Sequence, residues 1–311
     1  MIQQVLSTLL DVIVPLAIPV TAGALLARYK NLDTKPLLTL YLYFLTPAII
    51  LDTLANAEIS FGDVYQTIAF ALLNLLLLWL VSVVLGRLLK LAPPEAAGLT
   101  LISTFTNSVN YGLPLVLLAF GQLGLDKASV YVIVQMVIVN TIGVYFAARS
   151  QFNVKSAVKS VFALPAVYAA LLALLLRGLS LQLPQELASG VSMVAGAYSP
   201  VVLAILGAQM VRVQAGHTER NVQLAFWTGL SVRLLLSPLI ALLVLLLLNI
   251  SGTLFSVLLV LASMPVAVNS VVLAERFGSS PSLVSRCIVW TTLASFLVLP
   301  VLITAVGSVQ P

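Results

Sequence analysis

One long apolar stretch of the sequence is interrupted by amide, hydroxyl, Gly and Pro residues. It reads Thr104-Phe105-Thr106-Asn107-Ser108-Val109-Asn110-Tyr111-Gly112-Leu113-Pro114. Pro114 removes one backbone hydrogen bond of a helix and Gly112 loosens the chain just before it. We therefore expect carbonyl and N–H groups here that lipid cannot satisfy. The chemistry that such a segment offers is hydrogen bonding to a small polar or anionic ligand.

A second cluster of this kind has Ser263-Met264-Pro265 followed by Asn269-Ser270. At an offset of 157 residues, Ser108 falls opposite Pro265 and Gly112 opposite Asn269, which places both clusters at equivalent depths. If both helices are interrupted, their second halves point positive dipole ends at one place and attract anions. The alternative is that Pro and Gly merely kink the helices while Asn and Ser hold helix pairs together. The match between the clusters favours a binding site.

Other polar residues within apolar stretches are candidates for the same site. Gln135 and Asn140 follow the first cluster closely enough to line its cavity. Arg233 lies deep in an apolar stretch, where a charge costs about 2.5–3.5 kcal/mol on insertion scales and needs a partner. Arg233 either contacts an anionic substrate or ties helices together through carbonyl groups. The structural role is slightly favoured, because Pro238 frees a carbonyl on the same helix.

The composition determines which elements must position these residues. Of the 311 residues, 61% are apolar and 8% charged, whereas a soluble domain has about 25% charged residues. The net charge of +5 is spread between apolar runs, which does not resemble a nucleic-acid footprint. The implied partner is therefore a lipid bilayer. One Cys and one His exclude zinc sites, Cys-His nucleophile pairs and disulfide frameworks.

Apolar stretches long enough to cross a bilayer, about 20 residues each, predict an all-α polytopic membrane protein with ten transmembrane helices. The first span is interpreted as retained rather than as a cleaved signal peptide. Short loops predict antiparallel neighbours. The ten spans are residues 6–29, 36–56, 64–89, 95–121, 127–149, 157–178, 185–211, 222–249, 253–278 and 282–306.

Basic residues concentrate in the loops that follow odd-numbered spans and at the flanking span ends, which predicts that those loops are cytoplasmic. Both termini are then outside. The opposite side carries Lys127 and Arg177. The residues on the predicted cytoplasmic side are Arg28, Lys30, Lys35, Arg87, Lys90, Arg149, Lys155, Lys159, Arg212, Arg220, Arg276 and Arg286.

A weak internal repeat supports the count. Pro15 recurs as Pro165, Thr46-Pro47 as Ser199-Pro200, and Phe120-Gly121 as Phe277-Gly278, at offsets of 150, 153 and 157 residues. We expect two five-helix repeats, residues 1–150 and 151–311, intertwined into one unit. Because five is odd, the second repeat must be inverted. Inverted repeats are typical of secondary transporters with a site near the membrane midplane between broken helices.

Enzymes and channels fit this pattern less well than a carrier. A zinc protease needs two His residues on one helix, and an aspartyl protease needs two Asp residues in mid-membrane. The sequence has one His and no Gly-Lys dipeptide of the kind that ends a phosphate-binding loop. A channel is expected to have a polar stripe or a repeated filter. We therefore expect no enzymatic activity.

The motifs themselves resemble those of the auxin efflux carrier family, bacterial permeases related to plant PIN-type carriers. The segment from Phe105 to Leu115 with Phe120-Gly121 resembles the family's fourth-helix motif. Further matches over nearly the whole chain are Tyr43-Phe44-Leu45-Thr46-Pro47-Ala48, Tyr198-Ser199-Pro200 with Leu206-Gly207, and Met264-Pro265-Val266-Ala267 through Ala274-Glu275-Arg276-Phe277-Gly278.

The resemblance implies two inverted five-helix repeats that form a scaffold and a transport unit, with helices 4 and 9 broken and crossing. It implies alternating-access transport of an organic anion, such as an auxin-like acid or a small mono- or dicarboxylate, in the bacterial inner membrane. The family's substrate-contacting Asn falls on Asn107, and its crossover prolines fall on Pro114 and Pro265. The chain lacks the long central cytoplasmic loop of plant members, so their phosphorylation control has no place here. A homodimer is left open.

The coupling mechanism stays open at this point. Proton coupling normally needs an ionisable residue at mid-depth, and Arg233 stays charged. Uniport is slightly favoured over sodium coupling, in which a sodium ion lies near Asn107, Ser108, Gln135 and Asn269. No other cofactor is expected. A non-transporting membrane receptor on the same fold is a further alternative. The candidate substrate-binding residues are Asn107, Ser108, Asn110, Gly112, Pro114, Gln135, Pro265, Asn269 and Ser270.

Overall fold

The structure, a computed structural model, describes residues 2–55, 60–148, 162–179, 181–211 and 220–307. In these residues all regular structure is α-helix or π-helix, apart from one isolated antiparallel bridge. The expected all-helical architecture is confirmed for this part of the chain. Four basic residues used to orient the chain, Arg149, Lys155, Lys159 and Arg212, lie outside the described residues.

Seven helical stretches of the described chain are long and apolar enough to cross a membrane, and two shorter apolar helices cover residues 165–178 and 252–262. The count of ten spans therefore stays a prediction. The seven long stretches are Gln3–Lys30, Thr34–Ala55, Phe61–Leu88, Ser108–Ala147, Gln185–Val211, Val222–Leu247 and Pro281–Val306.

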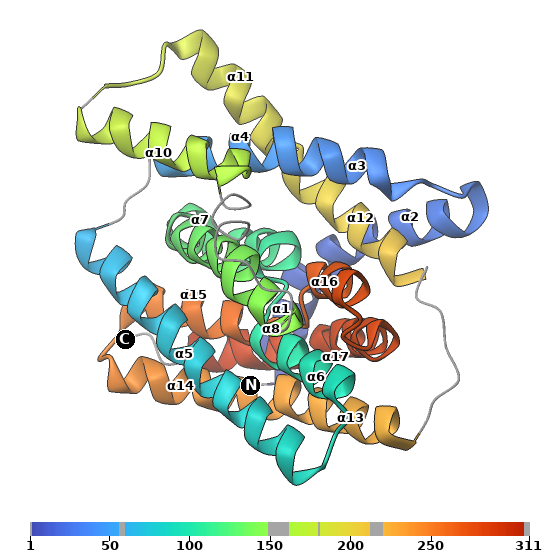
Figure 1. Cartoon of the computed structure of the whole chain (residues 1–311). Coiled ribbons are helices and arrows are strands. Elements are labelled where there is room, and N and C mark those ends of the chain that lie inside the picture. Colours follow the sequence, from blue (N-terminus) through green and yellow to red (C-terminus); the bar gives the residue numbers. More distant parts are fainter. Residues whose placement is uncertain (1, 56–59, 149–161, 180, 212–219, 308–311) are drawn as a thin grey trace.

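The helices form two groups, an upper and a lower one in the view of Figure 1. The upper group contains α2 (Val14–Lys30), α3 (Thr34–Leu40), α4 (Thr46–Ala55), α10 (Pro165–Gly178), α11 (Gln185–Gly196) and α12 (Tyr198–Val211). The lower group contains α5 (Phe61–Leu88), α6 (Pro93–Thr104), α7 (Leu113–Ile138), α8 (Val144–Ala148), α13 (Arg220–Ser231), α14 (Ser237–Leu247), α15 (Gly252–Ala262), α16 (Asn269–Phe277) and α17 (Pro281–Gly307).

The upper group is held together by contacts between segments far apart in the sequence. Helix α2 packs on α12, and α4 packs on α10. Gly23 and Gly207 lie where α2 and α12 cross. A Cβ on Gly23 would lie 1.9 Å from the Ala204 carbonyl oxygen, and a Cβ on Gly207 would lie 1.8 Å from the Val20 carbonyl oxygen. Small residues let two backbones approach closely where lipid provides no hydrophobic driving force. The proposed division at residue 150 and its inverted symmetry stay predictions.

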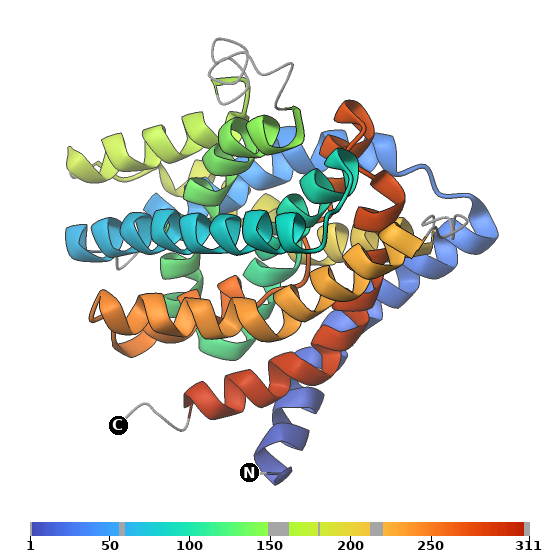
Figure 2. The same ribbon diagram turned by 60° about the horizontal axis from the view of Figure 1, so that its bottom comes forward.

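Both ends of the described chain lie on one side of the molecule (Figure 2). Helix α1 (Ile2–Thr8) packs on α17, and the hydroxyls of Thr8 and Thr304 are 3.2 Å apart. The first and last described helices therefore meet at one side of the molecule. The location of both termini outside the membrane rests on the basic loops and stays a prediction.

Five short π-helical segments interrupt the α-helices of the described chain. They are η1 (Leu9–Ile13), η2 (Tyr41–Leu45), η3 (Ser108–Gly112), η4 (Val139–Gly143) and η5 (Val232–Leu236). A proline lies two residues after four of them, at positions 15, 47, 114 and 238. Proline lacks an N–H and its ring clashes with the carbonyl four residues earlier, and the wider π turn moves that carbonyl away. Such turns are frequent at functional sites.

Two helices of the lower group are interrupted in mid-course. Helix α6 ends at Thr104, Phe105 is extended with φ −108° and ψ 124°, and the chain becomes helical again at Ser108. Helix α15 ends at Ala262, and α16 begins at Asn269. The position of the first interruption differs from the expectation. It comes before Ser108, whereas Pro114 lies in the first turn of α7, because η3 accommodates the proline without ending the helix.

The second half of the first interrupted helix is joined to the next helix at Gly121. Gly121 has φ 65° and ψ −160° inside α7, where the chain turns. The stretch Ser108–Ala147, 40 residues long, therefore combines the second half of the predicted span 95–121 with the predicted span 127–149. The matching residue after α16, Gly278, also has a positive φ of 69°.

Candidate functional site

The two interruptions lie against each other and satisfy each other's backbone groups. Thr106 and Val266 form an antiparallel bridge. The Asn107 N–H donates to the Pro265 carbonyl at 2.8 Å, and the Ala267 N–H donates to the Phe105 carbonyl at 3.0 Å. Unpaired backbone groups are costly away from water. The pairing explains why both helices can open at this place.

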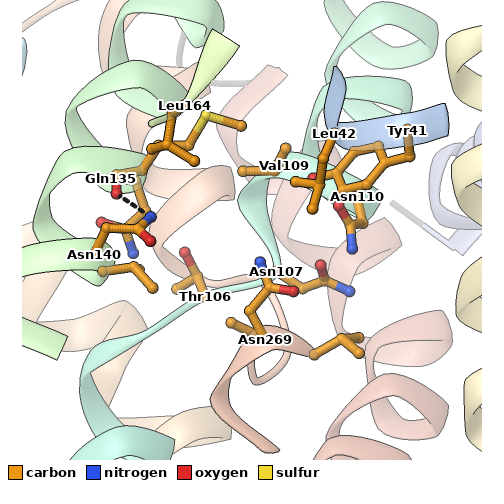
Figure 3. Close-up of a pocket in the computed structure, with 14 residues that line it drawn as sticks. Tyr41, Leu42, Thr106, Asn107, Val109, Asn110, Gln135, Asn140, Leu164 and Asn269 are labelled. Atoms are coloured by element: carbon orange, nitrogen blue, oxygen red, sulfur yellow. Dashed lines mark hydrogen bonds between the residues drawn. The ribbon is translucent and has the colours of Figure 1, made fainter. Parts of the chain in front are cut away.

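A pocket lies beside the paired interruptions (Figure 3). Its volume is about 50 Å³, which is room for a few water molecules, since one needs roughly 10–15 Å³. None of the described residues that line it is charged. They are Tyr41, Leu42, Thr106, Asn107, Val109, Asn110, Gln135, Met136, Val139, Asn140, Leu164, Ala267, Val268 and Asn269.

Segments η2, η3 and η4 each contribute residues to this pocket, so three of the π-helical segments in the described chain meet there. Leu42 comes from η2, Val109 and Asn110 from η3, and Asn140 from η4. The Asn140 amide nitrogen donates to the Met136 carbonyl at 2.8 Å, which holds the side chain against its own helix. The π turns thus bring the amides of Asn110 and Asn140 and the apolar side chain of Leu42 to one place.

The structure brings together four of the predicted site residues, which are Asn107, Asn110, Gln135 and Asn269. Figure 3 shows Asn107, Asn110 and Asn269 pointing toward the same space. Asn107 and Asn110 are both 3% exposed, and Gln135 is 5% exposed. Asn107, Asn110 and Asn269 lie at the two interruptions, and Gln135 lies in α7.

The other five predicted residues do not line the pocket. Ser108 and Ser270 are buried, and their hydroxyl groups have no hydrogen-bond partner among the described residues. Gly112 lets η3 approach α15, because a Cβ there would lie 2.6 Å from the Leu261 Cδ2 atom. Pro265 contributes its carbonyl to the bridge. Pro114 packs near Pro15 and Pro200, where the two helix groups meet.

Two buried amides at the pocket carry atoms without a hydrogen-bond partner in the described chain. These are the side-chain nitrogen of Asn107 and the side-chain oxygen of Asn110. A buried polar group without a partner costs about 1–3 kcal/mol. Such groups point to a ligand, an ion or water that completes their hydrogen bonds. The free nitrogen of Asn107 is a donor and suits an acceptor such as a carboxylate.

Tyr41 and Leu42 were not expected at the site. They come from η2 in the upper group, so the pocket lies between the two helix groups. The Tyr41 ring packs on that of Tyr198, with centroids 6.0 Å apart. The sequence signal that points to Leu42 is the Thr46-Pro47 dipeptide, because its proline imposes the π turn that contains Leu42. Which helix that turn faces depends on tertiary packing and could not be predicted.

Arg233 is fully buried and bonds to main-chain carbonyls rather than facing the pocket. Its guanidinium donates to the Ser103 carbonyl at 3.1 Å, and also to the Ala262 carbonyl and the Ser237 hydroxyl. Ser103 lies in the last turn of α6, and Ala262 is the last residue of α15. The sequence left two roles open for Arg233, contact with an anionic substrate and tying helices together through carbonyl groups. The structure contains the carbonyl contacts.

The described residues contain no group of three or more His, Cys, Asp or Glu side chains that could hold a metal ion. The oxygen-bearing groups at the pocket are neutral amides, hydroxyls and carbonyls. Sodium binding therefore stays a prediction that rests on neutral oxygens alone.

These observations describe a helical multi-pass membrane protein in which two interrupted helices meet at an uncharged polar pocket. A family model described as membrane transport protein matches residues 5–303. The chain therefore belongs to this family, the auxin efflux carrier family that its motifs indicate.

A protein of Methanothermobacter thermautotrophicus (strain Delta H) named an uncharacterized transporter is 27% identical over 256 residues, which cover 82% of this chain and 83% of the relative. The family and this relative indicate membrane transport.

Proposed function

We propose that the protein is a carrier that moves an organic carboxylate across the membrane, with the anion bound in the pocket beside the paired interruptions. The observation that carries the proposal is the buried side-chain nitrogen of Asn107, which has no hydrogen-bond partner in the described chain and lies on the pocket. A carboxylate oxygen would complete its bonding. The second halves of the interrupted helices add positive dipole ends at Ser108 and Asn269.

The pocket lies between the two helix groups, which supports alternating access as the transport mechanism. Tyr41 comes from the upper group, while Asn107 and Asn269 come from the lower group. A volume of about 50 Å³ admits a small carboxylate, and an auxin-like acid requires the groups to separate. Relative movement of one helix bundle against another is how such carriers expose a fixed site to each side in turn. No enzymatic step is part of this proposal.

Uniport is our first proposal for coupling, and sodium coupling is the second. The buried side-chain oxygen of Asn110 has no hydrogen-bond partner in the described chain. Such an oxygen can serve as a ligand of a cation, which is the reason to test sodium. A thermal-shift screen of organic acids, each with and without sodium, separates the two, because a ligand stabilises the state that it binds. An acid whose stabilisation is the same in both conditions supports uniport, and stabilisation only with sodium supports coupling.

The proposal places the protein in a bacterial inner membrane with both termini outside. The orientation rests on the excess of Lys and Arg in the loops after odd-numbered spans. Labelling of single cysteines introduced before Ile2 or after Gly307 with a membrane-impermeant reagent tests it, in a Cys287→Ser background. Labelling of intact cells at both ends is the expected result.

The test of the site is Asn107→Ala in proteoliposomes. We expect uptake of the labelled acid that the screen selects to be abolished, with the melting temperature close to that of the wild type. Asn74→Ala is the matched control, because Asn74 is an equally buried amide of α5 that does not line the pocket. Unchanged uptake by Asn107→Ala, or equal loss in the control, removes Asn107 from the site.

A further inference from the structure

Arg233 lies where the negative ends of two helices converge. The carbonyls that it bonds belong to Ser103, in the last turn of α6, and to Ala262, the last residue of α15. The last carbonyls of a helix have no partner within the helix and carry its negative partial charge. α6 and α15 are the first halves of the two interrupted helices. One side chain thus contacts both of their C-terminal ends.

The charges at this place balance. Each helix end carries about half an elementary charge, so two C-terminal ends contribute about −1 and Arg233 contributes +1. The third acceptor of the guanidinium is the hydroxyl of Ser237, so none of the three acceptors is a carboxylate. Ser237 also donates to the Ala262 carbonyl at 3.1 Å, which fixes it beside Arg233. The cation is therefore compensated by helix ends instead of by an acidic side chain.

The opposite sides of the same interruptions have the reverse sign. The second halves begin at Ser108 and Asn269, and their N-terminal ends together carry about +1. No charged residue lines the pocket in the described chain. The negative end of α6 lies four residues before Ser108, and that of α15 lies seven residues before Asn269. Without Arg233, these negative ends would largely cancel the positive ends.

We propose that Arg233 determines the pocket's preference for anions, because its charge cancels the negative ends of α6 and α15 and leaves the positive ends of the second halves uncompensated. This inference rests on the proposed function and assigns to that site the residue that sets its charge selectivity. Arg233 acts through the two interruptions and contacts no substrate. It is fully buried, so its field is weakly screened by salt.

The experiment compares acetate with acetamide, two probes of equal size that differ by one charge. Each is titrated against the full-length protein in detergent at constant ionic strength, and the concentration that gives half of the maximal thermal stabilisation is measured. Arg233→Gln keeps N–H donors for the carbonyls and removes the charge, whereas Arg233→Lys keeps the charge. A merely structural role predicts equal effects on both probes.

We expect wild type to bind acetate more tightly than acetamide. In Arg233→Gln, acetate binding should weaken about tenfold or more, because removing one charge about 12 Å away in a medium of effective dielectric about 20 changes binding about tenfold, while acetamide binding is unchanged. Arg233→Lys should keep the preference for acetate. An Arg233→Gln protein with the wild-type ratio, or equal weakening of both probes in either variant, overturns the inference.

A second pair of variants decides the case if Arg233→Gln does not fold. Ser237→Asp places a carboxylate against Arg233 and cancels its charge, and Ser237→Asn is the neutral control. We expect Ser237→Asp to lose the preference for acetate and Ser237→Asn to keep it, and a retained preference in Ser237→Asp overturns the inference. If wild type itself shows no preference for acetate over acetamide, the proposed carboxylate site fails and this inference fails with it.

Discussion

The hydroxyl of Tyr198 donates a hydrogen bond to the carbonyl of Val109 at 3.1 Å and so joins α12 of the upper group to η3 of the lower group. In a π turn the carbonyl of residue 109 would bond to the N–H of residue 114, which is a proline. Tyr198 therefore supplies the donor that Pro114 lacks. Since Val109 lines the pocket, this bond joins the two helix groups directly at the candidate site.

Tyr198→Phe should destabilise the protein, because the Val109 carbonyl is left without its donor. The expected cost is about 1–3 kcal/mol, that of an unsatisfied buried group, measured as a lower melting temperature in detergent. Tyr43→Phe is the control, because Tyr43 is 61% exposed and water can bond to its hydroxyl in place of a protein group. Equal melting temperatures for the two variants would show that the bond contributes nothing to stability.

Gly23→Ala should lower the melting temperature strongly, because the new methyl group would overlap the Ala204 carbonyl oxygen at 1.9 Å. That atom belongs to the backbone of α12 and cannot move aside as a flexible side chain can. Overpacking of this kind costs about 1–3 kcal/mol, and occasionally more. Gly190→Ala, with nothing within 4 Å of the added methyl, should be tolerated. A Gly23→Ala protein as stable as Gly190→Ala would contradict the close crossing of α2 and α12.

Gly121 and Gly278 should respond differently to replacement by Asn. Gly278, with φ 69° and ψ 30°, has the left-handed conformation that Asn tolerates at a helix end. Gly121, with φ 65° and ψ −160°, lies in a region that is essentially restricted to glycine. We expect Gly121→Asn to cost about 1–3 kcal/mol and Gly278→Asn clearly less. Melting temperatures of the two variants in parallel check this order, and the reverse order would contradict it.

The sequence was sufficient to predict that two apolar helices are interrupted, because Asn107, Ser108 and Pro265 do not suit a straight lipid-facing helix. It was not sufficient to place the first interruption. Pro114 was the strongest local signal, yet η3 accommodates it. The chain instead opens at Phe105–Asn107, where the carbonyl of Pro265 and the N–H of Ala267 provide partners. Those partners lie about half the chain away and leave no local sequence signal.

The same limit applies to the candidate site. The amide residues Asn107, Asn110, Gln135 and Asn269 could be selected from sequence, because polar side chains within apolar spans need a protein or ligand partner. Tyr41 could not, because an aromatic residue in an apolar helix is ordinary, and its place at the pocket depends on how the two helix groups pack. Phe120-Gly121 and Phe277-Gly278 look alike as dipeptides, although their backbone ψ angles differ.

Counterflow of a labelled carboxylate tests the central claim most directly. Proteoliposomes are loaded with an excess of the unlabelled acid that the thermal-shift screen selects, and entry of the labelled acid is followed. If the protein is a carrier with its site at the paired interruptions, labelled acid accumulates transiently in proteoliposomes that contain the wild-type protein. No accumulation is expected with Asn107→Ala. An acid that stabilises the wild-type protein but shows no counterflow would contradict the account and favour a receptor that binds without transport.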